Sequence, residues 1–136
     1  AWIINIGVKF NFLARRGFNK SEIILKCIAA ISDYFNIDKW QINQPIVIAE
    51  LVQVISTVDG IAAIVPPDVN NPKNLPLLIT NKWNSADGYS GNIYDINYSI
   101  KNGVLYPSLD PSIFELKYPN IDIEGRSVGD TVGIAY

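Results

Sequence analysis

Apolar and polar residues alternate strictly at the start of the chain. Every second residue from Trp2 to Phe12 is apolar, whereas polar side chains such as Asn5 and Lys9 have the opposite parity. A period of two is typical of a β-strand with one buried face. The pattern therefore predicts a strand over residues 2–13 whose apolar face is covered by other elements.

Helical spacing follows this strand. Asn19 and Glu22 have the spacing of a capping box, in which each side chain satisfies a free backbone amide at the start of a helix. Apolar residues then recur every three or four positions as far as Phe35. This stripe predicts a helix over residues 20–35 with one face turned to the core.

A polar connector and a second helix come next. Within the connector, Ile37, Trp40 and Ile42 are spaced so that they could pin it to the core. Residues 46–48 fit either a short strand or the first turn of the following helix, which the apolar stripe over residues 49–58 predicts. An Asp-Gly pair then ends the helix, and the apolar run before the double proline predicts a buried strand over residues 61–65.

The second half of the chain has a different composition. Seven of the eight prolines follow Val65, as do most of the tyrosines. Short apolar runs separated by Pro, Asn and Gly favour strands and loops. We expect strands over residues 75–80, 93–100, 104–106 and 113–118, a loop over 84–92, a hairpin around Lys101-Asn102-Gly103, and a last strand containing Ile121, Ile123 and Val128.

These elements together predict an α+β fold. Residues 1–65 form a strand-helix-helix-strand core module, with two helices on one face of a mainly antiparallel sheet. Residues 66–136 form a Pro- and Tyr-rich, hairpin-rich β extension of the same domain. The chain lacks Met and begins inside an apolar run, so we expect it to be a piece of a longer polypeptide.

Composition narrows the classes of function. The 136 residues carry 11 Lys and Arg against 13 Asp and Glu, with no His and one Cys. This balance offers no basic excess for nucleic acid, and the lack of His removes the commonest general base and metal ligand. Cys27 lies on the apolar stripe of the first helix, where we expect an inert core side chain. We expect no cofactor and no metal site, and the apolar runs are too short to span a membrane.

One oxygen-rich segment resembles the start of a calcium loop, because Asp95, Asn97 and Ser99 alternate. The later positions of that motif do not fit. Lys101 occupies a ligand position, and Tyr106 stands where a bidentate Glu is needed. We therefore expect a solvated hairpin rather than a cation site.

Carboxylate pairs are the remaining candidates for catalysis. Glu115 with Glu124, or Asp110 with Asp122, could supply an acid and a base across neighbouring strands. Isolated carboxylates on a polar face are usually solvent-facing charges. Residues 88–91 read Gly-Tyr-Ser-Gly, which lacks the spacing of a nucleophile elbow. We expect no catalytic residues, no enzyme activity and no small-molecule substrate.

Exposed aromatic side chains are the stronger candidates for function. Tyr and Trp bury a large area at low entropic cost while they keep a polar tip, so they are common in protein interfaces and sugar-binding surfaces. We expect contact with another chain; the alternative is a carbohydrate-binding module of a tail or surface protein that stacks sugars on Trp83, Tyr89 and Tyr94. The candidate interface residues are Trp83, Tyr89, Tyr94, Tyr98, Tyr106 and Tyr118.

The order of the motifs in the first 65 residues resembles the carboxy-terminal module of baseplate J-like proteins, structural subunits of contractile phage tails. The resemblance lies in residues 4–12, the Gly-Phe-Asn before the first helix, Tyr34-Phe35 at its end, and residues 48–63 with Val-Asp-Gly-Ile. Residues 88–126 are more specifically similar to the T-even-type baseplate wedge branch, through residues 91–96, 103–119 and 122–126. Residues 66–87 carry no resemblance.

This resemblance implies a structural role without a catalytic site. Members of the family join baseplate wedges into a ring around the tail hub, and the ring rearranges when the sheath contracts. The implied partners are other baseplate wedge proteins and a second copy of the chain itself. The implied location is the tail baseplate of the virion, assembled in the host cytoplasm.

Overall fold

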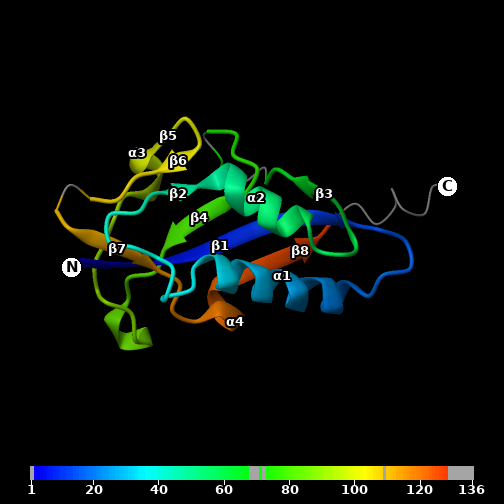
Figure 1. Cartoon of the computed structure of the whole chain (residues 1–136), viewed down its shortest axis with the longest axis horizontal. Coiled ribbons are helices and arrows are strands. Elements are labelled where there is room, and N and C mark those ends of the chain that lie inside the picture. The colour runs from blue at the N-terminus through cyan, green and yellow to red at the C-terminus, as the bar shows by residue number, and fades with distance from the viewer. Residues whose placement is uncertain (1, 68–70, 72, 109, 129–136) are drawn as a thin grey trace.

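β1 (Trp2–Ala14) is the central strand of the fold (Figure 1). The computed structural model describes residues 2–67, 71, 73–108 and 110–128. Along one edge of β1 lie β4 (Leu78–Asn81) and β3 (Ile61–Val65), both antiparallel to it. Along the other edge lie β7 (Ser112–Glu115) and β8 (Ile123–Ser127), both parallel to it. The long strand predicted from the alternation is thus confirmed, and it organises the whole sheet.

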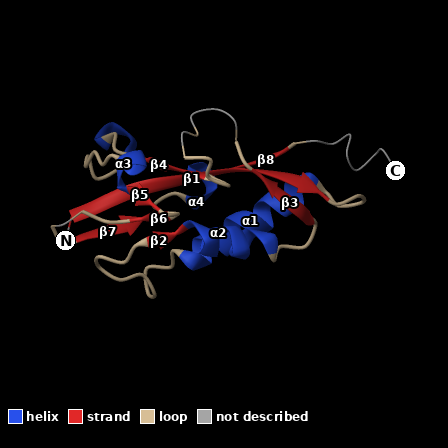
Figure 2. Ribbon diagram, turned by 90° about the horizontal axis from the view of Figure 1, so that it is seen from above, coloured by secondary structure: helices blue, strands red, loops and turns tan. Residues whose placement is uncertain are grey.

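Two helices cover one face of this sheet. α1 (Lys20–Tyr34) begins after Asn19, whose Oδ1 accepts hydrogen bonds from the backbone amides of Ser21 and Glu22, as the capping sequence predicts. α2 (Ile48–Ser56) packs against α1 and leads into β3. Figure 2 shows both helices on the same side of β1. The predicted strand-helix-helix-strand unit is therefore present, but β3 is not the buried strand that its apolar run predicts, since Ile61 is its only buried residue.

A small second sheet is formed by three two-residue strands, β2 (Ile46–Val47), β6 (Val104–Leu105) and β5 (Ile100–Lys101), which pair in this order. β5 and β6 form the predicted hairpin. Asn102 and Gly103 at its turn both have positive φ, at 54° and 75°, as a two-residue turn between antiparallel strands requires. Both interpretations of residues 46–48 are partly correct. Ile46 and Val47 form the short strand β2, and Ile48 is the first residue of α2.

Two predicted strands in the second half differ from the structure. The apolar residues over 93–100 predict a strand, but the side chain of Asp95 caps the short helix α3 (Ile96–Ser99), and only the end of the segment enters β5. The strand expected over residues 75–80 begins later, as β4. The loop expected over residues 84–92 contains one turn of 3-10 helix, η1 (Ser85–Asp87).

A short helix interrupts the last strand region. Trp2 pairs with Ser112, and Val8 pairs with Ile123. The stretch from Ser112 to Ile123 is therefore five residues longer than the stretch of β1 from Trp2 to Val8 that it accompanies. The longer connection contains α4 (Pro119–Asp122), which lies between β7 and β8. The sequence predicts a last strand that includes Ile121, but Ile121 lies in α4 and is exposed. A proline in the first turn is compatible with a helix start because that position needs no amide donor.

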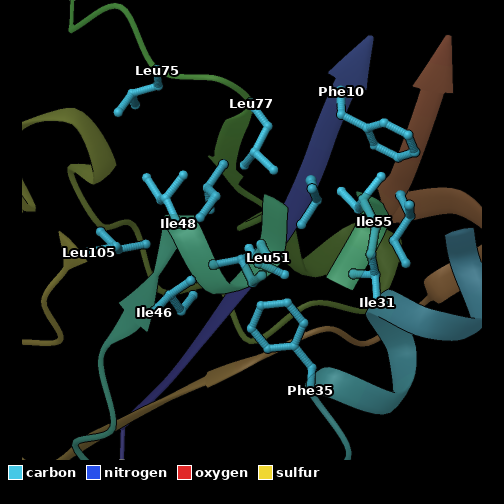
Figure 3. Packing of buried hydrophobic residues seen from close by; sticks show 14 of the residues in the cluster. Phe10, Ile31, Phe35, Ile46, Ile48, Leu51, Ile55, Leu75, Leu77 and Leu105 are labelled. Atoms are coloured by element: carbon cyan, nitrogen blue, oxygen red, sulfur yellow. The ribbon is translucent and has the colours of Figure 1, made fainter. Parts of the chain in front are cut away.

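The core lies between β1 and the two helices. Ile4, Ile6, Val8, Phe10 and Phe12 are all buried, which confirms that the alternating face lies beneath the helices, although Trp2 at its start is partly exposed. Figure 3 shows how side chains from α1, α2 and neighbouring segments converge on this face. The helices contribute buried residues at helical spacing: Ile23, Cys27, Ile31, Leu51 and Ile55.

The fold is α+β, as predicted. In the described part of the chain it contains four α-helices and eight strands, and four of the six strand pairings are antiparallel. The two parallel pairings both involve β1. None of the described helices has the length and apolarity to cross a membrane.

Candidate functional site

The six candidate interface aromatics fall into two groups. Tyr94, Tyr98 and Tyr106 lie near the start of β1, whereas Trp83, Tyr89 and Tyr118 line a groove beside α4. Trp83, Tyr98 and Tyr106 are exposed, and the other three are half-buried. The six aromatic residues, which the sequence suggests as one cluster, therefore lie on two separate surfaces of the structure.

The first surface surrounds the first residues of β1. Tyr94 packs edge-on against Trp2, with ring centroids 6.4 Å apart, and its hydroxyl donates a hydrogen bond to the carbonyl oxygen of Tyr106 at 2.7 Å. Tyr94 also packs against the buried ring of Phe114, so it links this surface to the core. We call the exposed side chains gathered there the β1-start surface, which comprises Trp2, Ile3, Ile42, Ile93, Tyr98 and Tyr106.

Backbone and side-chain contacts bring these separate segments together. The amide of Trp2 donates to the carbonyl of Pro111, and Asn43, beside Ile42, exchanges two hydrogen bonds with Ser112. The amide side chain of Asn92, beside Ile93, donates to the carbonyl of Ile3 at 2.7 Å. In Figure 1 the N-terminus, β7, β6 and α3 lie at the same end of the molecule. Large exposed apolar side chains collected in this way are typical of protein contact sites.

The second surface is a groove with a volume of about 600 Å³ beside α4. Its aromatic walls are Trp83, which is 49% exposed, and the rings of Tyr89 and Tyr118, which pack edge to face with centroids 5.4 Å apart. The other lining residues are Asn81, Lys82, Asn84, Asp87 and Ile121. We call this the Trp83 groove.

A buried carboxylate holds one wall of the Trp83 groove. Asp122 is fully buried, and its side chain accepts hydrogen bonds from the Tyr89 hydroxyl at 2.5 Å and from the Tyr118 amide at 3.3 Å. Desolvation and the hydrogen bond to Asp122 raise the pKa of the Tyr89 hydroxyl, so it remains a donor. The Lys117 ammonium donates to the carbonyl of Gly88. Asp122 thus ties the loop that carries Tyr89 and Ser90 to α4.

Asn5 fixes the same loop to the sheet. The alternation predicts a solvent-facing Asn5, but the residue is only 1% exposed. Its Oδ1 accepts a hydrogen bond from the Ser90 amide at 2.8 Å, and its Nδ2 donates to Glu115 Oε1 at 2.6 Å. A buried amide must have such partners. Nothing in the local sequence distinguishes Asn5 from a surface residue, because both partners are more than eighty residues away.

The structure separates the paired carboxylates. Glu115 lies opposite Asn5 and Glu124 opposite Lys9, four positions further along β1, which corresponds to about 13 Å of strand. Glu124 forms an exposed ion pair with Lys9 at 3.8 Å. Asp110 precedes β7 and Asp122 precedes β8, so they are separated along β1 as well. Neither pair has the geometry of a glycosidase site.

The remaining candidate chemistry has structural explanations. Asp95 caps α3 through its side chain, and residues 88–91 form a loop rather than a strand-to-helix turn. Burial raises the pKa of the Cys27 thiol to about 11, consistent with an inert core side chain. In the described residues, no three His, Cys, Asp or Glu side chains gather as metal ligands.

A further hollow of about 720 Å³ lies between the end of α1 and β7. Its walls include the buried rings of Phe35 and Trp40, whose centroids are 4.9 Å apart, and the exposed side chain of Ile37. Of the three residues expected to pin the connector, Trp40 alone is buried, whereas Ile37 and Ile42 face solvent. Trp40 is thus the one apolar side chain of the three that anchors the connector, and the two hydrogen bonds between Asn43 and Ser112 hold its end.

Comparison with known proteins adds no assignment to this geometry. No family model matches the chain, and the search of curated proteins finds no significant match.

Proposed function

We propose that the chain is part of a structural subunit of a contractile phage tail baseplate. In this role it is a wedge protein that provides protein-protein contacts in the baseplate ring and relays the rearrangement of the ring when the sheath contracts. The proposal starts from the resemblance of residues 4–63 and 88–126 to the baseplate J-like family and its T-even-type wedge branch. It includes location in the virion and no catalytic activity.

The observation that carries an assembly role is the β1-start surface. Exposed aromatic and aliphatic side chains from five separate segments surround the first residues of β1. A protein interface gains most of its energy from such side chains, particularly Trp and Tyr, once water is excluded around them. We infer that this surface receives other baseplate wedge proteins or a second copy of the chain.

The construction of the core favours transmission of movement. β1 runs as one strand of 13 residues from the β1-start surface to the turn before α1, a distance of about 40 Å. It pairs with four other strands and carries the buried face beneath both helices. A densely packed element of this kind moves as a unit, because its interior deforms little. Force applied at one end would therefore reach the other.

Substitution at the exposed tyrosines tests the proposal. The variant Tyr98→Ala/Tyr106→Ala should fold normally, because Tyr98 and Tyr106 are exposed, but should reduce the number of complete baseplates seen by electron microscopy of phage lysates. Phe18→Ala is the matched control, since Phe18 is 45% exposed and lies beyond the opposite end of β1. Normal assembly with the double variant, or an equal defect with Phe18→Ala, would contradict this assignment.

A further inference from the structure

We propose that the Trp83 groove binds a neutral saccharide, with a sugar ring stacked on Trp83. This site is separate from the β1-start surface and does not depend on the assembly role. It also differs from the platform suggested by the sequence, because Tyr94 is occupied by its contacts with Trp2, Phe114 and Tyr106.

The groove provides an aromatic surface of the required kind. The apolar face of a pyranose ring, formed by its C–H groups, packs on an aromatic face, and Trp offers the largest such face among the side chains. Trp83 is half exposed, while Tyr118 and the exposed Ile121 extend the apolar wall beside it. The volume of about 600 Å³ lies within the range of ligand pockets, roughly 300–1,000 Å³.

The groove also carries polar groups without partners. No described residue forms a hydrogen bond or ion pair with the Asp87 carboxylate, the Lys82 ammonium, the Trp83 indole N–H or the Asn84 side-chain amide N–H. These are one acceptor group and three donors at the rim of an aromatic wall. Sugar hydroxyls both donate and accept hydrogen bonds, so they can satisfy both kinds.

The charges favour a neutral ligand. Lys82 and Asp87 are the two charged residues among those that line the groove, and their charges cancel. An acidic sugar or a phosphate would meet no net positive charge, and a cation would meet no net negative charge. A neutral polyhydroxylated ligand uses both groups as hydrogen-bonding partners. An aliphatic protein surface would leave them unpaired at a cost in binding energy.

The lining is held in place before any ligand arrives. Asn84 Oδ1 accepts a hydrogen bond from the Ala86 amide and so caps η1, and Gly88 ends η1 with a φ of 93°. A side chain at Gly88 would collide with the Tyr118 hydroxyl, so this close approach requires glycine. Together with the hydrogen bond between Tyr89 and Asp122, these contacts fix the side of the groove formed by Tyr89 and Tyr118. A preformed site loses little entropy on binding.

Glycan binding with matched variants tests the inference. The chain would be applied to an array of neutral oligosaccharides, and hits would be titrated by NMR with the free sugar. We expect binding to at least one neutral saccharide, weakened about tenfold or more by Trp83→Ala, which corresponds to about 1.4 kcal/mol. Trp83→Phe should retain part of the affinity, and Asp87→Asn should weaken it without changing thermal stability. Tyr98→Ala, which removes an exposed aromatic side chain outside the groove, should bind as the unmodified chain does.

Two results would overturn the inference. The first is the absence of binding to any neutral saccharide by the unmodified chain. The second is binding that Trp83→Ala leaves unchanged although circular dichroism shows that the variant is folded. A protein captured through a photo-reactive residue at position 83, without saccharide binding, would identify the groove as a protein interface instead. Because Tyr98→Ala/Tyr106→Ala tests assembly at the other surface, either proposal can fail alone.

Discussion

Replacement of Asp122 by alanine should loosen the Trp83 groove and destabilise the domain. The variant removes the acceptor for the Tyr89 hydroxyl and the Tyr118 amide at a site that is fully buried. Hydrogen bonds to a charged group contribute about 1.5–3 kcal/mol each, and the bond from the Tyr118 amide is the longer of the two. Removal of the buried charge also recovers part of the free energy spent on desolvating it. We expect a net loss of about 2–4 kcal/mol, or a fall in Tm of roughly 6–16 °C for a domain of this size.

Thermal denaturation and hydrogen exchange measure these two effects. The Ser90 amide, which donates to Asn5, should exchange faster in Asp122→Ala, because the loop that carries it loses its tie to α4. Asp122→Asn keeps an acceptor oxygen and should lose less stability. Glu124→Ala removes an exposed ion pair with Lys9 and should change stability by about 0–1 kcal/mol. A Tm for Asp122→Ala equal to that of Glu124→Ala, with unchanged exchange at Ser90, would refute the role given to Asp122.

Three further predictions follow from the fold. Cys27 should resist iodoacetamide at pH 8 until urea unfolds the chain. The pKa of Cys27 in the folded chain, about 11, lies above the value of 9.0 for a free thiol. The contribution of the Cys27 thiol to the free energy of unfolding is therefore present below pH 9 and falls between pH 9 and 11. Urea titrations of Cys27→Ala should lack this pH dependence. Gly125→Ala would place a methyl group 2.6 Å from the buried ring of Phe10, and urea unfolding should show a loss of about 1–3 kcal/mol; an unchanged midpoint would contradict this packing. Asn102→Val puts a β-branched residue at a φ of 54° and should cost about 1–2 kcal/mol, whereas Asn102→Gly should be tolerated in the same assay.

The first half of the fold could be predicted because its signals are local. The alternation in β1, the cap at Asn19 and the stripes of both helices each specify an element within one short stretch of sequence. Helix bounds therefore agree with the structure to within one or two residues at most ends. The segment at residues 46–48 was ambiguous because its apolar residues serve β2 and the first turn of α2 together.

The second half depends on distant contacts. The short helices α3 and α4 interrupt segments whose apolar content favours strands. The position of α4 depends on the pairing of both β7 and β8 with β1, which lies more than one hundred residues earlier in the chain. Asp95 carries a local signal for the first of these helices, since a side-chain oxygen at that position can cap the next turn. Pro119 carries one for the second, as a proline that opens a helix.

The candidate site was predicted in its residue types but not in its arrangement. The six aromatics could be named from the sequence, yet their division between two surfaces arises from tertiary contacts such as those of Tyr94 with Trp2. Asn5 and Asp122 looked like ordinary polar residues, and their burial results from contacts with Ser90 and Tyr89 in the distant loop. Sequence patterns cannot reveal such partners because the patterns describe one segment at a time.

Site-specific photo-cross-linking in assembled phage particles tests the central claim most directly. A benzoylphenylalanine residue would replace Tyr106, which is 48% exposed in the β1-start surface, and Phe18, which is 45% exposed at the far end of β1. The account predicts that position 106 forms adducts with other baseplate wedge proteins or with a second copy of the chain, and that position 18 forms far fewer. Particles in which position 106 yields no adduct with any tail protein, although the substituted chain is incorporated, would contradict it.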